Sequence, residues 1–126
     1  MKISHLDHLV LTVASIEVTV DFYSRVLGME HEVFGEGRVA LRFGNQKINL
    51  HQRGHEFNPH AQHVQTGSAD LCFIAETPLE AVISRLHSAN VRLLEGPVKR
   101  TGAIGMIESV YFRDPDGNLI EVSNYL

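Results

Sequence analysis

The order of predicted elements in the first half of this chain recurs in the second half, and this internal repeat restricts the fold more than any other feature. Branched apolar residues from His5 to Val13 predict a strand. Apolar residues at helical spacing from Ile16 predict a helix that ends at Gly28. Glycine turns then separate three expected strands, at Glu30–Phe34, Arg38–Phe43 and Lys47–Gln52.

The second half begins the same order again with a strand expected at Leu71–Ala75. Thr77, Pro78 and Glu80 predict a helix start, as N-cap, first helical residue and capping-box glutamate. Asn90 can end this helix. Extended stretches are then expected at Val91–Leu94, Ile107–Arg113 and Leu119–Asn124.

Two local echoes support the repeat. His8–Leu11 aligns with Asp70–Phe73, each directly before a helix, and Ile48–His51 aligns with Ile120–Ser123, each closing its half. The sequence therefore predicts one α+β domain of two βαβββ modules, about residues 1–54 and 68–126, joined by a polar linker at about 55–67. The two curved mixed sheets are expected to form a cup.

Alternation along the strands predicts which side chains lie away from the helices, because successive residues of a strand point to opposite faces. In each of four strands the apolar residues take the helix side, and a polar residue takes the other. If the sheets curve toward each other, these polar groups converge: His8, Asn49 with His51, Asp70 with Cys72, and Glu121 with Ser123.

Imidazole and carboxylate groups together suit Mn, Fe, Ni or Zn, so this set predicts a divalent metal site. Ordinary structural roles remain open for its members. His8 can be a hydrogen-bonded core residue, and His51 an exposed residue at the end of a strand. Asp70 can cap backbone groups, and Asn49 can satisfy a turn. Glu121 is the most informative, because an ionised carboxylate in mid-strand is costly to bury without a neutralising cation.

Composition limits the partners. The 126 residues are 44% hydrophobic and 21% charged, and no apolar run approaches the ~20 residues of a membrane span. The N-terminus has no signal-peptide pattern, and Cys72 is the single cysteine, so we expect a cytoplasmic protein without disulfides. A net charge of −4 with scattered basic residues argues against nucleic acid as a partner.

The motifs at the two ends of the chain resemble those of the vicinal oxygen chelate superfamily, also called the glyoxalase/bleomycin-resistance/dioxygenase superfamily. They are the first strand at Leu6–Val13, the Phe-Tyr-x-x-x-Leu-Gly segment at Asp21–Gly28, and the Asp-Pro-Asp-Gly-Asn segment within Phe112–Glu121. Within it the chain looks most like the small glyoxalase domain-containing or virulence-associated proteins, through Lys47–His51 and Gly96–Ala103. The resemblance implies a homodimer.

By resemblance, metal ligands come from the first and last strands of each module, which gives His8, Asn49, Asp70 and Glu121. Asn49 is a weak ligand and His51 shares its face, so we predict His8, His51 and Glu121, with Asp70 as a fourth and Asn49 as a ligand or lining residue. Asp70 or Glu121 is a candidate base. Substrate contacts are expected from Tyr111, and from Lys99 or Arg100 in a glycine-flanked loop of the second module.

Two functions follow from the resemblance. One is a metal-dependent lyase, isomerase, transferase or dioxygenase that chelates two neighbouring oxygens of a small molecule. The other is a metal-free binding protein like the bleomycin-resistance proteins. Glyoxalase I activity itself is not predicted, because Asn49 and Asp70 replace its usual ligands. Whether the cup forms within one chain or across a swapped dimer is left open by the sequence.

Overall fold

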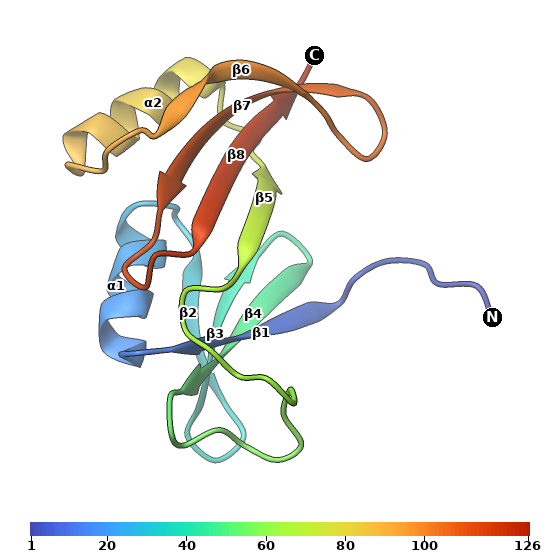
Figure 1. The fold of residues 1–126 in the computed structure, drawn as a ribbon, viewed down its shortest axis with the longest axis vertical. Helices are drawn as coiled ribbons and strands as arrows, with labels where there is room; N and C mark the ends of the chain where they lie inside the picture. The colour runs from blue at the N-terminus through green and yellow to red at the C-terminus, as the bar shows by residue number, and fades with distance from the viewer. The chain divides into compact units, whose positions relative to one another are not determined.

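The structure is a computed structural model that describes all 126 residues. The chain divides into two compact units, Met1–Thr66 and Gly67–Leu126. Each unit is a four-stranded mixed sheet with one helix (Figure 1). Neither helix is long and apolar enough to cross a membrane.

Unit 1 contains the elements β1 (His8–Val13), α1 (Ile16–Arg25), β2 (Glu30–Phe34), β3 (Arg38–Phe43) and β4 (Gln46–Gln52). The sheet order is β1-β4-β3-β2, with β1 parallel to β4 and the other pairs antiparallel. Ser15 caps α1 by accepting a hydrogen bond from the Val18 amide at 3.2 Å. Gly28, at φ 70°, follows the helix in the left-handed conformation that the sequence predicts.

Unit 2 repeats this arrangement with β5 (Asp70–Ile74), α2 (Leu79–Ser88), β6 (Glu95–Thr101), β7 (Met106–Arg113) and β8 (Leu119–Tyr125). Its sheet order, β5-β8-β7-β6, matches that of unit 1, again with the first and last strands parallel. The predicted pair of βαβββ modules and the α+β class are therefore confirmed.

The start of α2 differs from the prediction. The N-cap position falls on Pro78, and no side chain of the local sequence caps the helix. Instead Asn124 of β8 accepts a hydrogen bond from the Leu79 amide at 2.8 Å and donates to the carbonyls of Ala75 and Thr77. Asn124, which is distant in the sequence, therefore caps the helix in place of Thr77. The spacing of residues near the helix start cannot predict such a contact. Asn90, at φ 58°, follows the helix as predicted.

The strand expected at Val91–Leu94 is also wrong, because β6 runs from Glu95 to Thr101. Lys99 and Arg100 therefore lie in a strand and not in a loop. Pro97 is tolerated since β6 is the edge strand and its register shifts between Glu95 and Val98. The first strand begins at His8 and not at His5.

The core of each unit lies between its helix and one face of its sheet. In unit 1 this face carries fully buried side chains from β1, β3 and β4, and in unit 2 from β7 and β8. The opposite face of each sheet carries no helix, and we call it the helix-free face. The buried strand side chains on these faces are Leu11, Val13, Leu41, Ile48 and Leu50 in unit 1, and Val110, Phe112, Ile120 and Val122 in unit 2.

Candidate functional site

The register of unit 1 sets the predicted polar residues on its helix-free face. In the parallel pair of β1 and β4, His8 lies beside Lys47, and Thr12 lies beside His51. Asn49 lies between Val10 of β1 and Ala40 of β3. Alternation therefore predicted the faces of His8, Asn49 and His51 correctly. The face as a whole comprises His8, Val10, Thr12, Glu30, Glu32, Phe34, Arg38, Ala40, Arg42, Lys47, Asn49 and His51.

Two side chains on this face are buried without hydrogen-bond partners. Asn49 is 6% exposed and His51 is 3% exposed. The Oδ1 atom of Asn49 and both ring nitrogens of His51 have no partner. A buried polar atom without a hydrogen bond costs about 1–3 kcal/mol, and native proteins retain few of them. This pair therefore has the character of a binding surface whose hydrogen bonds await a ligand.

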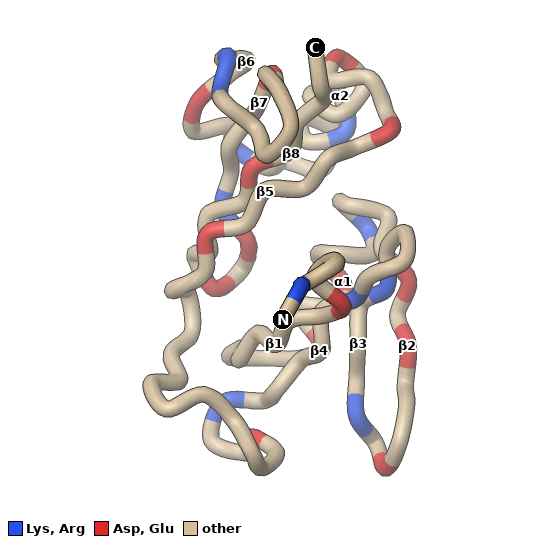
Figure 2. Tube along the Cα trace, turned by 90° about the vertical axis from the view of Figure 1, so that its right-hand side faces the viewer, with Lys and Arg blue, Asp and Glu red and all other residues tan.

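Two cations and two aromatic rings near His51 contact one another, and we call them the cation–aromatic cluster: Phe34, Arg38, Lys47 and Phe57. The Lys47 ammonium lies 3.8 Å from the centre of the Phe34 ring. The Arg38 guanidinium lies 5.4 Å from the Phe34 ring and 4.7 Å from the Phe57 ring. Figure 2 shows basic positions along β3 and acidic positions along the neighbouring β2.

The cluster was not predicted from the sequence. A sequence signal for Arg38 did exist. The short hairpin at Gly44–Asn45 pairs Phe43 with Gln46, and alternation along the two strands from that pair predicts Arg38 and His51 on the same face. Phe57 carried no such signal, because it belongs to the segment that the sequence marked as a linker.

His51 is held in its neutral form. Burial lowers its pKa below the ordinary value of 6.5, and the nearby Arg38 charge lowers it further. Its ring packs edge-on against Phe57 with centroids 5.5 Å apart. A neutral imidazole has one N–H donor and one nitrogen lone pair, so it can bind a metal, accept a proton or hydrogen-bond an oxygen.

His8 has a different environment from His51. Its Nδ1 atom lies 2.8 Å from Oδ2 of Asp7, and both side chains are exposed. A metal-binding histidine usually donates its other ring N–H to a carboxylate or a carbonyl, and Asp7 is such a partner for Nδ1 of His8. The hydrogen bond to His8 lowers the pKa of Asp7. His8 and His51 stand four residues apart in register, about 13 Å along the sheet, so the structure does not bring them together.

A hollow of about 350 Å³ opens beside His51 within unit 1. Its walls combine the helix-free face with the segment that follows β4. Apolar groups predominate among them, and His51 is the buried polar group of the set. The lining residues are Val10, Thr12, His51, Pro59, His60, Ala61 and Val64.

The helix-free face of unit 2 carries a connected hydrogen-bond network around Glu121. Ser109 donates to Oε2 of Glu121 at 2.6 Å, and the hydroxyls of Ser109 and Ser123 lie 2.6 Å apart. Cys72, which is opposite Glu121 in register, has its sulfur 3.5 Å from Ser123 Oγ. Burial raises the pKa of the Cys72 thiol, so it is not a thiolate at neutral pH. Sequence reasoning predicted Glu121 and Ser123 on this face and did not predict their hydrogen bonds with Ser109.

Tyr111 and Arg100 join the same face. Tyr111 is opposite Glu121 in register, and its hydroxyl accepts a hydrogen bond from Arg100 Nε at 3.2 Å. Burial raises the pKa of Tyr111, and Glu121 raises it further, so the phenol stays protonated. Arg100 also donates to Glu95 and to the carbonyl of Lys99. A hollow of about 430 Å³ is lined by Cys72, Ile74, Arg100, Thr101, Gly102, Ala103, Ile107, Tyr111, Glu121 and Tyr125.

The other predicted residues of unit 2 lie differently. Asp70 is exposed and begins β5, where it pairs with Leu119. It lies on the same face as Glu121, which pairs with Cys72 two residues further along the strand. Lys99 is opposite Glu108 and points to the other face of β6 from Arg100. The structure therefore separates Lys99 from Tyr111 and Arg100. It contains no group of three or more His, Cys, Asp or Glu side chains that could hold a metal ion by themselves.

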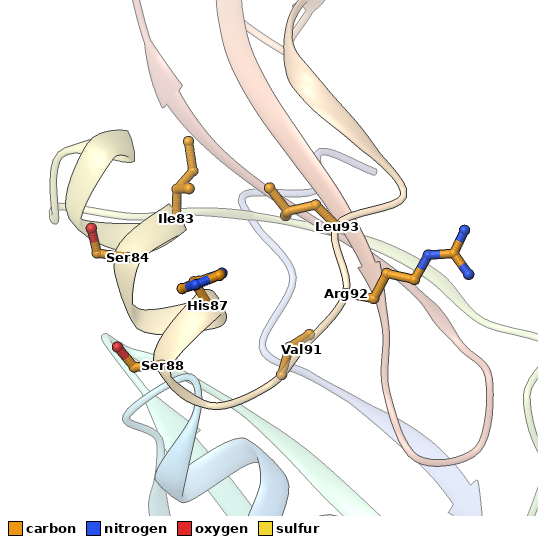
Figure 3. A pocket seen from close by; sticks show the side chains of 7 residues that line it. All are labelled: Ile83, Ser84, His87, Ser88, Val91, Arg92 and Leu93. Carbon is orange, nitrogen blue, oxygen red and sulfur yellow. The ribbon is translucent and has the colours of Figure 1, made fainter.

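A third hollow, of about 510 Å³, lies beside α2 and involves none of the predicted site residues. Figure 3 shows its lining on α2 and on the segment that follows it, with Arg92 extended away from the helix. These residues are Ile83, Ser84, His87, Ser88, Val91, Arg92 and Leu93.

Over residues 5–122 the chain matches the Glyoxalase/Bleomycin resistance protein/Dioxygenase superfamily. It is 55% identical over 126 residues to the virulence protein STM3117 of Salmonella typhimurium, covering 100% of this chain and 88% of that protein. The crystal structure of STM3117 matches with a TM-score of 0.99 over 100% of both chains. An integron cassette protein from the mobile metagenome of V. cholerae is 64% identical, with a TM-score of 0.98 over 100% of this chain and 98% of that one. The metallothiol transferase FosB of Shouchella clausii is 27% identical over 121 residues, covering 95% of this chain and 80% of that protein.

Proposed function

The chain belongs to the Glyoxalase/Bleomycin resistance protein/Dioxygenase superfamily, and on that premise we propose that it is a metal-dependent enzyme acting on a small oxygenated molecule. The reaction class is that of a lyase, isomerase, transferase or dioxygenase. One observation carries the proposal: Asn49 and His51 are buried with unpartnered polar atoms on the helix-free face of unit 1. A bound ligand would satisfy these atoms, and a structural role would not.

His8 and Glu121 are the proposed ligands to test first, with Asp70 as a further ligand. His51, also predicted from the sequence as a ligand, lies four residues from His8 in register, so we propose that it contacts the substrate instead. The Asp7 carboxylate supports His8, because it orients the ring through Nδ1. The two serine hydroxyls support Glu121, because they fix one carboxylate oxygen and leave the other available. The Oδ1 atom of Asn49 is a further oxygen donor without a partner.

A divalent metal, as Mn, Fe, Ni or Zn, would act as a Lewis acid that stabilises negative charge developing on the substrate. The protein's own groups have separate tasks. Tyr111, kept as a phenol, can donate a hydrogen bond to a substrate oxygen. Arg100 holds the Tyr111 hydroxyl in position and is itself engaged by Glu95. Neutral His51 can accept a proton or a hydrogen bond.

The test is the metal content of purified protein after loading with Mn, Fe, Ni or Zn in turn, measured by mass spectrometry. We expect wild type to retain close to one equivalent of one metal. His8→Ala and Glu121→Gln should each lower the metal affinity by about 10- to 100-fold or more, since loss of a group that only hydrogen-bonds to a metal ligand already has that effect. Removing the metal should lower Tm, because a bound ion stabilises the folded state.

Two matched variants serve as controls. His31→Ala removes an exposed histidine of β2, and Glu108→Gln removes a carboxylate from β7 next to Ser109 in the chain. Both should retain the metal. Failure of wild type to retain any of the four metals would contradict the proposal, and equal losses in the control variants would remove its assignment to His8 and Glu121.

A metal-free binding protein is the second candidate. The Arg38 cation beside His51 favours it, because a positive charge next to an imidazole disfavours a metal cation on that ring. The two candidates differ in the ligand affinity of His8→Ala. The affinity stays at the wild-type value in a metal-free binding protein and is lost in a metal-dependent enzyme.

Two further parts of the proposal concern the state of the protein. We expect a homodimer, which light scattering coupled to size-exclusion chromatography measures directly. We also expect a cytoplasmic location, which fractionation of the host cell tests.

A further inference from the structure

Two cations on the helix-free face of unit 1, Arg38 and Lys47, form no salt bridge, although the Lys47 charge helps to lower the pKa of Asp7. Both cations are half-buried. Their contacts are with the Phe34 and Phe57 rings. A half-buried cation that lies against a ring and not against a carboxylate keeps its hydrogen-bond donors available.

Arg42 provides a direct contrast on the same strand. It lies four residues from Arg38 on the same face of β3, and both oxygens of Glu32 accept its hydrogen bonds, at 2.9 and 3.1 Å. Glu32 of β2 therefore forms a salt bridge with Arg42 of β3, whereas Arg38 of the same strand forms none. Glu56, the acidic group that acts on His51, is itself bonded to the Gly54 amide at 2.7 Å.

The floor beneath the two cations is polar and unsatisfied. Asn49 and His51 are more than nine-tenths buried, and their unpartnered atoms lie on the same face as Arg38 and Lys47. Ala40, the register partner of Asn49 on β3, is fully buried on the same face. His51 also lines the hollow of about 350 Å³, whose other walls include Val10, Pro59 and Val64.

We propose that Arg38 and Lys47 form an anion subsite that binds the carboxylate or phosphonate of a small organic ligand, while Asn49 and His51 bind its neighbouring oxygens. The apolar body of the ligand lies in the hollow beside His51. This inference rests on the proposed function, because it names the charge class of the ligand that the same face takes. Arg supplies a planar pair of donors for an oxyanion and Lys supplies a point charge, which is the usual division of labour at such sites.

The test is a titration of chelator-treated protein with phenylphosphonate, followed in ¹⁵N-resolved NMR spectra, with benzyl alcohol as the neutral probe. Wild type should bind phenylphosphonate at least tenfold more tightly than benzyl alcohol. Arg38→Gln should weaken phenylphosphonate binding about tenfold or more, and Lys47→Gln about three- to tenfold, as expected for charge-assisted hydrogen bonds. Arg42→Gln is the matched control, with the same change of net charge and an affinity within about twofold of wild type.

The result that would overturn the inference is equal weakening by all three substitutions, equal binding of the neutral probe, or no binding of phenylphosphonate by wild type. Unchanged spectra away from the site establish that each variant is folded. Metal content is measured on the same samples, and Arg38→Gln should retain the wild-type amount. If no metal binds but Arg38-dependent anion binding persists, the metal proposal fails and this inference stands.

Discussion

The two units have the same topology, but the buried polar groups on their helix-free faces differ in hydrogen bonding. In unit 2, Glu121, Ser109, Ser123 and Cys72 form a connected network in which the buried hydroxyls have partners. In unit 1, the corresponding strand β4 carries polar side chains that are just as buried, and His51 has no hydrogen bond from either ring nitrogen.

The difference indicates that the two repeated units contribute differently to stability and to the proposed binding. A satisfied network stabilises the fold and fixes the direction of Glu121 and Tyr111 before any ligand arrives. An unsatisfied pair costs stability in the free protein and gains it back when a ligand binds. Unit 2 therefore carries the satisfied network, and unit 1 carries the unsatisfied pair on which the proposed ligand would act.

The largest effect is expected from the turn that precedes the last strand of unit 2. Asn118, which is 2% exposed, donates to Oδ2 of Asp114 at 2.8 Å and accepts from the Ala69 amide at 2.9 Å. Asn118→Ala should cost about 3 kcal/mol in the free energy of unfolding, because it removes both bonds in a buried setting. Urea denaturation measures this.

The equivalent turn of unit 1 provides the control. Gly44–Asn45 connects β3 to β4, and Asn45 is exposed. Asn45→Ala should change the free energy of unfolding by less than about 0.5 kcal/mol. If both substitutions lower the free energy of unfolding equally, the proposed contrast between a turn held by side-chain hydrogen bonds and a simple hairpin is wrong.

A smaller loss is expected within the network itself. Ser109→Ala removes the 2.6 Å hydrogen bond to Glu121 and the contact with the Ser123 hydroxyl. It should lower the free energy of unfolding by about 1–2 kcal/mol, since Ser109 is fully buried and bonds to a charged group. An unchanged free energy of unfolding in urea denaturation would show that the hydrogen bonds of Ser109 do not stabilise unit 2.

Much of this arrangement could be predicted from the sequence, because strand parity is a local property. His8, Asn49 and His51 in one unit, and Glu121 and Tyr111 in the other, lie on the faces that alternation assigns. The repeat was equally accessible, since each unit carries its own turn and cap signals.

The remainder depends on contacts between segments distant in the sequence. Whether a buried polar group is satisfied cannot be predicted from parity, because Glu121 finds its short hydrogen bond on another strand, from Ser109 of β7, while the ring nitrogens of His51 have no partner. The edge position that tolerates Pro97 is known only once β6 pairs with β7. Local propensity therefore misplaced β6, and the Asn124 bonds that cap α2 were missed for the same reason.

Replacing the unsatisfied histidine tests the comparison from the other side. His51→Phe keeps a ring of similar size against Phe57 and removes two buried nitrogens without partners. In ligand-free protein we expect a free energy of unfolding equal to that of wild type or up to about 1 kcal/mol higher. The same variant should lose ligand binding. A loss of more than about 1 kcal/mol in urea denaturation would mean that His51 is already satisfied in the free protein.

The smallest effect is a difference in pH dependence between wild type and His51→Phe in chelator-treated protein. The folded pKa of His51 lies below its ordinary value of 6.5, mainly because the ring is buried. As the pH falls through about 6.5, the unfolded chain takes up a proton that the folded protein refuses, so the free energy of unfolding decreases. The stabilisation is fully present above that pH and is lost toward the lower, folded pKa. Wild type should therefore lose more stability than His51→Phe between pH 7 and about pH 5 in parallel urea titrations. Parallel curves would place His51 in an environment no different from that of the exposed histidines.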